Sequence, residues 1–330
     1  MPVVELSAYR SPLLLRHSHL LTVIPSLFRK VTGVSYVRQR LELSDGDFVD
    51  LDWSRTGAER LVLLCHGLES SARSEYIRGM VRALNRRRWD CLALNFRGCS
   101  GVPNRLLRTY HSGDTADVAA VIRHIIAHCP HRELALVGFS LGGNVVLKYL
   151  GEGERNVPAM LTTAAAVSAP VDLAGSAERL ARPGNRLYMR RFLRKLRRKL
   201  EEKRALFPDD IHLDDYDRMT TFREFDDRYT APFHGFTDAA DYWARSSSRQ
   251  FLPGIRRPTL LLNAADDPFL SPSCFPRAEA EGNPRFFLEI PSRGGHVGFV
   301  RFFDPQREYY HEERVAVFLE EHSRLKPPDG

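Results

Sequence analysis

The chain has 330 residues, of which 43% are hydrophobic and 27% are charged. This length allows one large core, or a core with an inserted subdomain. No apolar stretch approaches the roughly 20 residues that a transmembrane helix needs. The N-terminus also lacks the long apolar region and the cleavage site of a signal peptide. The five cysteines form no C-x-x-C pair, which favours reduced thiols and a cytoplasmic location.

The net charge of +7 comes from one segment of the chain. Residues 182–204 contain eleven Lys or Arg and two Glu, whereas residues 207–241 contain ten Asp or Glu and three Arg. Because these oppositely charged segments follow one another, we expect them to pair with each other. The overall charge is therefore weak evidence for a nucleic-acid partner, and we expect none.

The predicted elements begin with a hairpin and continue as alternating strands and helices. Residues 36–43 and 47–53 flank S-D-G, which indicates an antiparallel hairpin. Six short apolar runs have the pattern of strands buried on both faces: 61–65, 91–96, 134–139, 164–169, 259–264 and 286–290. Helical patterns cover 76–86 and 114–128, the second with a cap expected at Ser112–Asp114. This order predicts an α/β fold with a mostly parallel twisted sheet and helices on both faces.

The alternation stops between about residues 171 and 250, where the pattern is helical, charged and aromatic. Apolar residues at 188, 192, 193, 196 and 200 have helical spacing. We therefore expect 171–250 to be an inserted helical cap. The core would then consist of residues 1–170, with an N-terminal extension at 1–35, and residues 251–330.

Ser140 lies in L-V-G-F-S-L-G-G-N-V-V (136–146), between a predicted strand and a helical segment. Gly138 and Gly142 complete a G-x-S-x-G pattern, which carries chemistry when a strand precedes it and a helix follows. The turn needs strained backbone angles and close contact between strand and helix, and glycines permit both. The setting predicts a nucleophile at Ser140, with an ordinary tight turn as the alternative.

A serine hydroxyl becomes nucleophilic when a neighbouring base takes its proton. His296 follows the last predicted strand in G-G-H-V-G-F (294–299), a loop that leaves its ring free to reach Ser140. The acid that orients the imidazole should follow the preceding strand, where A-D-D-P-F supplies Asp266 and Asp267. We prefer Asp266, which lies three residues past the polar residue that ends the strand, with Asp267 as the alternate acid. An Asp-Pro turn accounts for the unused carboxylate.

Two backbone N–H groups should stabilise the oxyanion that forms when the serine attacks a carbonyl. Leu141, directly after the nucleophile, provides one, and Leu68 in H-G-L provides the other. His66 is then a structural histidine. We expect no metal and no cofactor: His124 and His128 have the spacing of a zinc pair, but no third ligand is evident.

Six motifs spread over most of the chain carry a family resemblance. They are L-L-C-H-G-L (63–68), N-F-R-G-C-S-G (95–101), Y-H-S-G-D (110–114), G-F-S-L-G-G-N (138–144), N-A-A-D-D-P-F (263–269) and G-G-H-V-G-F (294–299). With them the chain resembles the α/β-hydrolase group (AB hydrolase 4) that contains bacterial YheT-type hydrolases, plant EMB8-like proteins and animal ABHD1/ABHD3-like lipases. One departure is H-S-H-L-L-T (17–22), where the group often has a Gln before the Thr. We attach no catalytic consequence to it.

The resemblance implies an α/β-hydrolase fold and a serine hydrolase, esterase-like or lipase-like, that cleaves carboxylic (acyl) esters. It implies a triad of Ser140, Asp266 (or Asp267) and His296, and an acyl-enzyme intermediate. The alternative from another class is a non-catalytic binding protein that retains the fold.

The basic run at 190–200 allows two interpretations. Its apolar residues form one stripe, as in a cap helix with a solvated basic face. It could instead rest on an anionic membrane surface and deliver lipid esters to the site. We expect the substrate to be a small-molecule or lipid acyl ester in either case.

Overall fold

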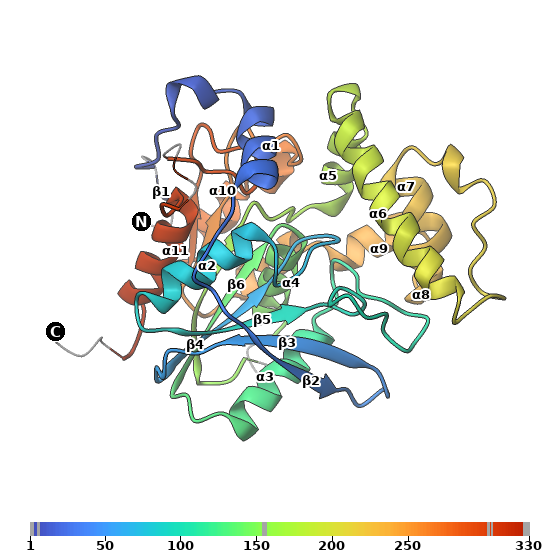
Figure 1. Cartoon of the computed structure of the whole chain (residues 1–330). Coiled ribbons are helices and arrows are strands. Elements are labelled where there is room, and N and C mark those ends of the chain that lie inside the picture. The colour runs from blue at the N-terminus through green and yellow to red at the C-terminus, as the bar shows by residue number, and fades with distance from the viewer. Residues whose placement is uncertain (1–2, 5–6, 154–156, 302–303, 305, 326–330) are drawn as a thin grey trace.

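The computed structural model describes the chain except residues 1–2, 5–6, 154–156, 302–303, 305 and 326–330. Nine strands form one sheet in the order β1-β9-β8-β7-β6-β4-β5-β3-β2 (Figure 1). Their bounds are β1 Val3–Val4, β2 Val37–Glu42, β3 Phe48–Ser54, β4 Arg60–Cys65, β5 Asp90–Asn95, β6 Glu133–Phe139, β7 Leu161–Val167, β8 Thr259–Leu262 and β9 Phe286–Glu289. All neighbours pair parallel except β2 with β3 and β3 with β5. The predicted mostly parallel sheet with an antiparallel hairpin at its edge is confirmed.

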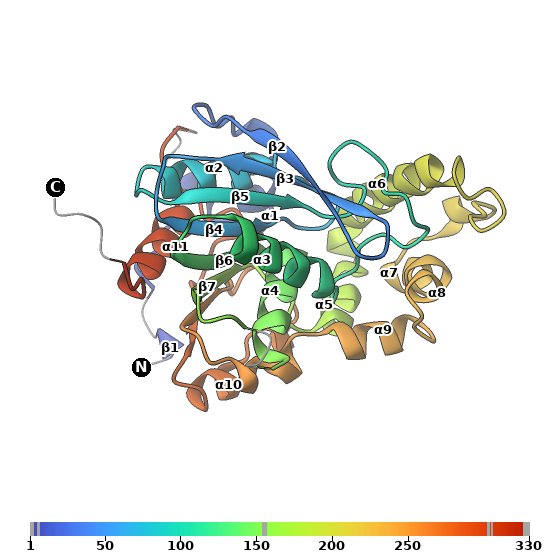
Figure 2. The same cartoon turned by 90° about the horizontal axis from the view of Figure 1, so that it is seen from below.

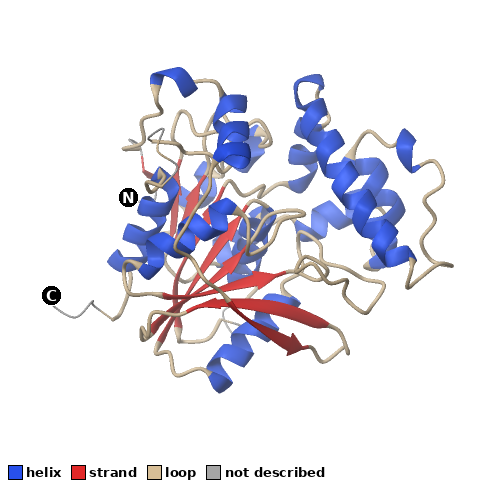
Figure 3. Ribbon diagram, in the orientation of Figure 1, coloured by secondary structure: helices blue, strands red, loops and turns tan. Residues whose placement is uncertain are grey.

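Helices cover both faces of this sheet (Figures 2 and 3). Their bounds are α1 Ser18–Phe28, α2 Glu75–Asn85, α3 Ala116–His128, α4 Leu141–Gly151, α5 Leu173–Leu180, α6 Arg186–Arg204, α7 Phe222–Phe225, α8 Ala231–Phe233, α9 Ala239–Ser246, α10 Arg277–Glu281 and α11 Tyr310–Glu321. Apolar residues of α3 and α4 pack on one face, and those of α2 and α11 pack on the other. Strands such as β4 and β6 are therefore buried along their whole length, which explains their continuous apolar runs.

The start of α3 differs from the expected cap at Ser112–Asp114. The helix begins at Ala116, and the preceding Thr115 makes no capping hydrogen bond through its side chain. The Asp114 carboxylate instead accepts a hydrogen bond from Arg108, at 2.7 Å. The sequence pattern assigned the Asp114 carboxylate to the helix end, but in the structure it forms an ion pair with Arg108 of the preceding loop.

The chain between β7 and β8 folds into helices α5 to α9, which lie to one side of the sheet (Figure 1). They have hydrophobic clusters of their own, in which Leu193, Leu196 and Leu200 of α6 pack with Tyr216 and Phe225. We call this helical region the cap, as expected for 171–250, although its boundaries stay a prediction.

The expected pairing of the basic and acidic segments occurs at one ion pair among the described residues, between Arg197 and Asp217. In the described part of the chain no helix is both long and apolar enough to cross a membrane.

Candidate active site

Ser140 occupies the sharp turn between β6 and α4. Its backbone has φ 52° and ψ −120°, a region that residues other than glycine rarely adopt. A Cβ on Gly138 would lie 2.3 Å from the carbonyl oxygen of Gly142, and one on Gly142 would lie 2.4 Å from that of Cys65. Only glycine fits at both positions, as the sequence pattern predicted.

His296 joins Ser140 to a buried carboxylate. The Ser140 hydroxyl donates to His296 Nε2 at 3.0 Å, and His296 Nδ1 donates to Asp267 Oδ2 at 2.9 Å. Asp267 is buried, and its other oxygen accepts from the Phe269 N–H at 2.9 Å. The carboxylate accepts from Nδ1 and thereby leaves the Nε2 lone pair for the serine hydroxyl.

The preference for Asp266 over Asp267 needs correction in this geometry. Among the described residues no hydrogen bond joins Asp266 to the imidazole; the Asp266 Oδ1 accepts from the Gly295 N–H at 2.9 Å. Burial raises the pKa of Asp266, against the opposing effect of that hydrogen bond. Neighbouring side chains in a turn point in different directions. The Asp267 carboxylate therefore reaches the ring of His296, and the Asp266 carboxylate accepts from the backbone beside that ring.

The N-terminal helix α1 supports the loop that carries His296. The His296 N–H donates to Thr22 Oγ1 at 2.9 Å, and the Thr22 hydroxyl donates to the Ser18 carbonyl at 2.8 Å. A Cβ on Gly295 would lie 2.8 Å from that same Ser18 oxygen. The Phe269 ring also packs on the imidazole, with centroids 4.3 Å apart. Sequence reasoning missed the role of Thr22, and the two glycines before His296 were the available signal of a close approach.

The loop after β4 passes directly beside Ser140: a Cβ built on Gly67 would lie only 3.1 Å from Ser140 Cβ. Among the described residues, no hydrogen bond is assigned to the N–H of Leu68 or of Leu141. His66 is buried, with Nδ1 against the Gly67 carbonyl at 2.7 Å and Nε2 accepting from a backbone N–H. Burial lowers its pKa to about 3, which fits a neutral structural histidine.

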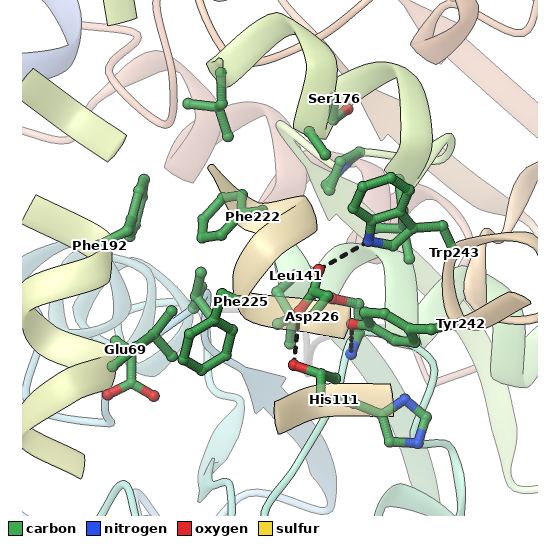
Figure 4. A pocket seen from close by; sticks show the side chains of 18 of the residues that line it. Glu69, His111, Leu141, Ser176, Phe192, Phe222, Phe225, Asp226, Tyr242 and Trp243 are labelled. Carbon is green, nitrogen blue, oxygen red and sulfur yellow. Dashed lines mark hydrogen bonds between the residues drawn. The ribbon is translucent and has the colours of Figure 1, made fainter. Parts of the chain in front are cut away.

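An apolar cavity of about 140 Å³ opens on Ser140 and His296. Most of its wall comes from cap side chains: Leu173, Ala177, Leu180, Phe192, Leu196, Leu200, Phe222, Phe225 and Phe233. Figure 4 shows this lining, including Phe192, Phe222 and Phe225. A polar side chain, Asp226, lies among them and accepts from Trp243 Nε1 at 2.9 Å and from Thr230 Oγ1 at 2.6 Å. Burial raises the pKa of Asp226 to about 7.

A second cavity, of about 360 Å³, also includes Ser140 and His296 in its lining. Its remaining wall is more polar and comes mostly from the core and α1: Thr22, Ser26, Ser70, Arg73, Ser74 and Glu75, with Arg191 and Lys195 from α6. The serine hydroxyl therefore lies between an apolar space under the cap and a less apolar one beside the core.

The histidine pair on α3 does not form a metal site with other residues of the described chain. The rings of His124 and His128 stack with centroids 4.6 Å apart, and His124 Nε2 contacts the Gln39 amide at 3.2 Å. No group of three or more candidate ligands is found where the structure is described.

Comparisons with known proteins show the family to which this fold belongs. Residues 60–301 match the family model described as alpha/beta hydrolase fold. The chain is 39% identical to YheT of Escherichia coli over 91% of this chain and 89% of that protein. It is 29% identical to mouse phospholipase ABHD3 over 87% and 72% of the two chains, and 32% identical to monoacylglycerol lipase of Saccharomyces cerevisiae over 79% and 59%.

Among solved structures, an esterase from Pyrococcus furiosus shares the fold, with a TM-score of 0.60 and 18% identity, over 88% of this chain and 92% of that one. The family model covers well over half of the sequence, and the predicted resemblance is confirmed. The chain belongs to the α/β-hydrolase family.

Proposed function

We propose that this protein is a serine hydrolase that cleaves carboxylic (acyl) esters through Ser140, His296 and Asp267. The observation that carries the proposal is the continuous chain of hydrogen bonds from the Ser140 hydroxyl to the buried Asp267 carboxylate, at 3.0 and 2.9 Å. This arrangement activates a nucleophile without a metal or cofactor.

In the first step, His296 Nε2 takes the hydroxyl proton as Ser140 Oγ forms a bond to the ester carbonyl carbon. The Asp267 carboxylate stabilises the imidazolium that results, and the N–H groups of Leu68 and Leu141 donate to the developing oxyanion. The C–O bond to the alcohol then breaks, the carbonyl re-forms, and Nε2 gives its proton to the departing alkoxide. The acyl group remains on Ser140.

Water completes the cycle at the same residues. His296 takes a proton from water as the water oxygen attacks the acyl carbon. The tetrahedral intermediate collapses, Ser140 leaves with the proton that His296 returns, and the acid is released. The strained turn at Ser140 keeps its oxygen above the sheet throughout, because the backbone angles are fixed by packing at Gly138 and Gly142.

The two cavities suggest how an ester would lie. The acyl chain suits the apolar cavity under the cap, and the alcohol suits the cavity beside the core, whose wall has more polar and charged side chains. Relatives named phospholipase and monoacylglycerol lipase support a small-molecule or lipid acyl ester as substrate.

Labelling with a fluorophosphonate probe, together with turnover of short p-nitrophenyl esters, tests the proposal. We expect the wild-type chain to show both, and Ser140→Ala to lose both with kcat reduced by about 10⁶-fold. Undiminished labelling of Ser140→Ala would exclude Ser140 as the nucleophile. A folded wild-type chain that neither labels nor turns over any ester would favour the non-catalytic binding protein.

Contact with an anionic membrane through residues 190–200 stays a prediction. The side chains of Arg190, Arg194 and Arg198 on α6 are exposed, as is Leu187, which keeps 77% of its surface. Such a face would bind vesicles containing anionic lipid less well as salt rises. Pelleting that does not change when the anionic lipid is removed would contradict membrane binding by this face.

A further inference from the structure

Two lysines of helix α6 in the cap contact the core loop that follows β4. Lys199 Nζ contacts Glu69 Oε1 at 2.7 Å and donates to Cys99 Sγ at 3.0 Å. One turn earlier, Lys195 Nζ donates to the backbone carbonyl of Glu69 at 2.9 Å. The side chains of the Lys199–Glu69 pair keep only 11% and 8% of their surface. This ion pair therefore lies well out of solvent, unlike the usual surface pair.

Lys199 differs from its basic neighbours on the same helix, whereas Lys195 is itself exposed. Arg197 and Arg198 form ion pairs with Glu201 and Glu202 of α6 itself, where solvent weakens the interaction. Although burial opposes it, Cys99 and Glu69 hold the pKa of Lys199 above its usual range. Lys199 is therefore a fixed positive charge aimed at the core.

The target, Glu69, follows the proposed oxyanion donor Leu68. Its backbone has φ 50°, a left-handed conformation that costs free energy for a residue other than glycine. The Glu69 N–H donates to Tyr110 Oη at 2.8 Å, and the Tyr110 hydroxyl donates to Glu69 Oε1 at 2.9 Å. On the other side, the Gly67 N–H donates to Tyr76 Oη at 2.9 Å. Hydrogen bonds thus hold the backbone on both sides of Leu68, and in the described part of the chain none is assigned to the Leu68 N–H.

We propose that Lys199 and Lys195 are positioning residues that let the cap hold the oxyanion loop in its catalytic conformation through Glu69. The cap then does more than enclose the acyl chain, because its longest helix anchors the backbone that bears the Leu68 N–H. Figure 4 shows Glu69 and Phe192 of α6 on the same side of the apolar cavity. This inference rests on the proposed function, since it concerns the oxyanion donors of that reaction.

The test compares Lys199→Met and Glu69→Gln with Arg186→Met, a control on the same helix. Arg186 is exposed, and no partner is assigned to it within the described residues. Four quantities are measured: kcat and KM for a p-nitrophenyl ester, the Kd of phenylboronic acid, and Tm. The boronic acid forms a tetrahedral adduct with a serine oxygen, and an oxygen on boron then occupies the oxyanion position.

We expect both variants to lose kcat by about 10- to 100-fold, since small displacements of a catalytic donor have effects of this size. KM should change less than about twofold, and the Kd of the boronic acid should rise in parallel with the loss of kcat. The double variant should lose little more than either single variant, because both act through one contact. Lys199→Arg, which keeps the charge, should recover part of kcat.

Three outcomes would overturn the inference: an unchanged kcat in both variants, a loss confined to KM, or an equal loss in Arg186→Met. If Lys199→Met fails to fold, Glu69→Gln decides alone, since it keeps the size of the side chain. If the wild-type chain itself has no Ser140-dependent turnover, the proposed function fails rather than the role of the lysines.

Discussion

The sheet core and the cap differ in what they contribute to the site. In the core, Ser140, Asp267 and His296 each follow a strand of one mostly parallel sheet, and buried backbone contacts fix their positions. The cap provides most of the apolar wall and packs through two hydrophobic clusters, the larger of which also includes Phe269 of the core. The difference suggests a division: a change in the core should lower kcat for every ester, and a change in the cap should alter which ester is preferred.

The largest expected effect separates two adjacent carboxylates of the core. Asp267→Asn should lower kcat by about 10⁴-fold for all esters, because an amide cannot stabilise the imidazolium. Asp266→Asn should leave kcat close to wild type, because the amide oxygen can still accept from the Gly295 N–H. Steady-state kinetics of the two variants on one short ester measure the contrast. A larger loss in Asp266→Asn would reverse the assignment made from the geometry.

A smaller and selective effect is expected in the cap. Ala177 lines the apolar cavity, so Ala177→Phe would fill part of the space available to an acyl chain. We expect kcat/KM for long-chain esters to fall by about 10- to 100-fold, with acetate esters nearly unchanged. Ala181→Phe, at the exposed residue directly after the same helix, is the matched control. A uniform loss across chain lengths would break the division between core and cap.

Thr22 offers a test of the core at a distance from the reacting atoms. Thr22→Val removes the acceptor of the His296 N–H and keeps the side-chain shape. We expect kcat to fall about tenfold through misplacement of the imidazole, equally for short and long esters, and Thr22→Ser to restore it. Unchanged kcat in Thr22→Val would show that the loop around His296 holds its position without α1.

The smallest effect concerns stability and belongs to the cap. Burial raises the pKa of Asp226 to about 7, whereas an unfolded Asp titrates near about 3.9. Between these values the folded state keeps a proton that the unfolded state has lost, so this group makes stability fall as pH rises. Asp226→Asn removes this contribution. Its Tm relative to wild type should therefore rise by about 2 °C or more from pH 5 to pH 8, and a constant difference would contradict the assignment.

Much of the fold could be predicted because a sheet covered on both faces needs uninterrupted apolar strands. The predicted runs at 61–65 and 134–139 correspond to β4 and β6, with ends that differ by one residue at most. The glycines around Ser140 could be interpreted because their reason is local, namely the contact between one strand and the next helix. Steric requirements of this kind can be recognised from a few adjacent residues in the sequence.

The remaining features depend on side-chain directions and on contacts between distant segments. The choice between Asp266 and Asp267 depends on the path of a turn, which two identical neighbouring residues cannot reveal. The contacts of His296 with Thr22, and of Lys199 with Glu69, join residues more than 100 positions apart. The expected pairing of the basic segment with the following acidic one failed for Lys195 and Lys199. The cap lies against the core, and the core offers these two lysines nearer partners.

The contact between α1 and the loop around His296 has a consequence for anyone who shortens this chain. The segment that matches the family model, 60–301, contains the proposed triad and both proposed oxyanion donors. It omits Ser18 and Thr22, which lie against Gly295 and the His296 N–H. A fragment trimmed to the family segment would keep every reacting group but lose the helix that holds the loop of His296 in place. Expression variants of this protein should therefore retain the helix at Ser18–Phe28.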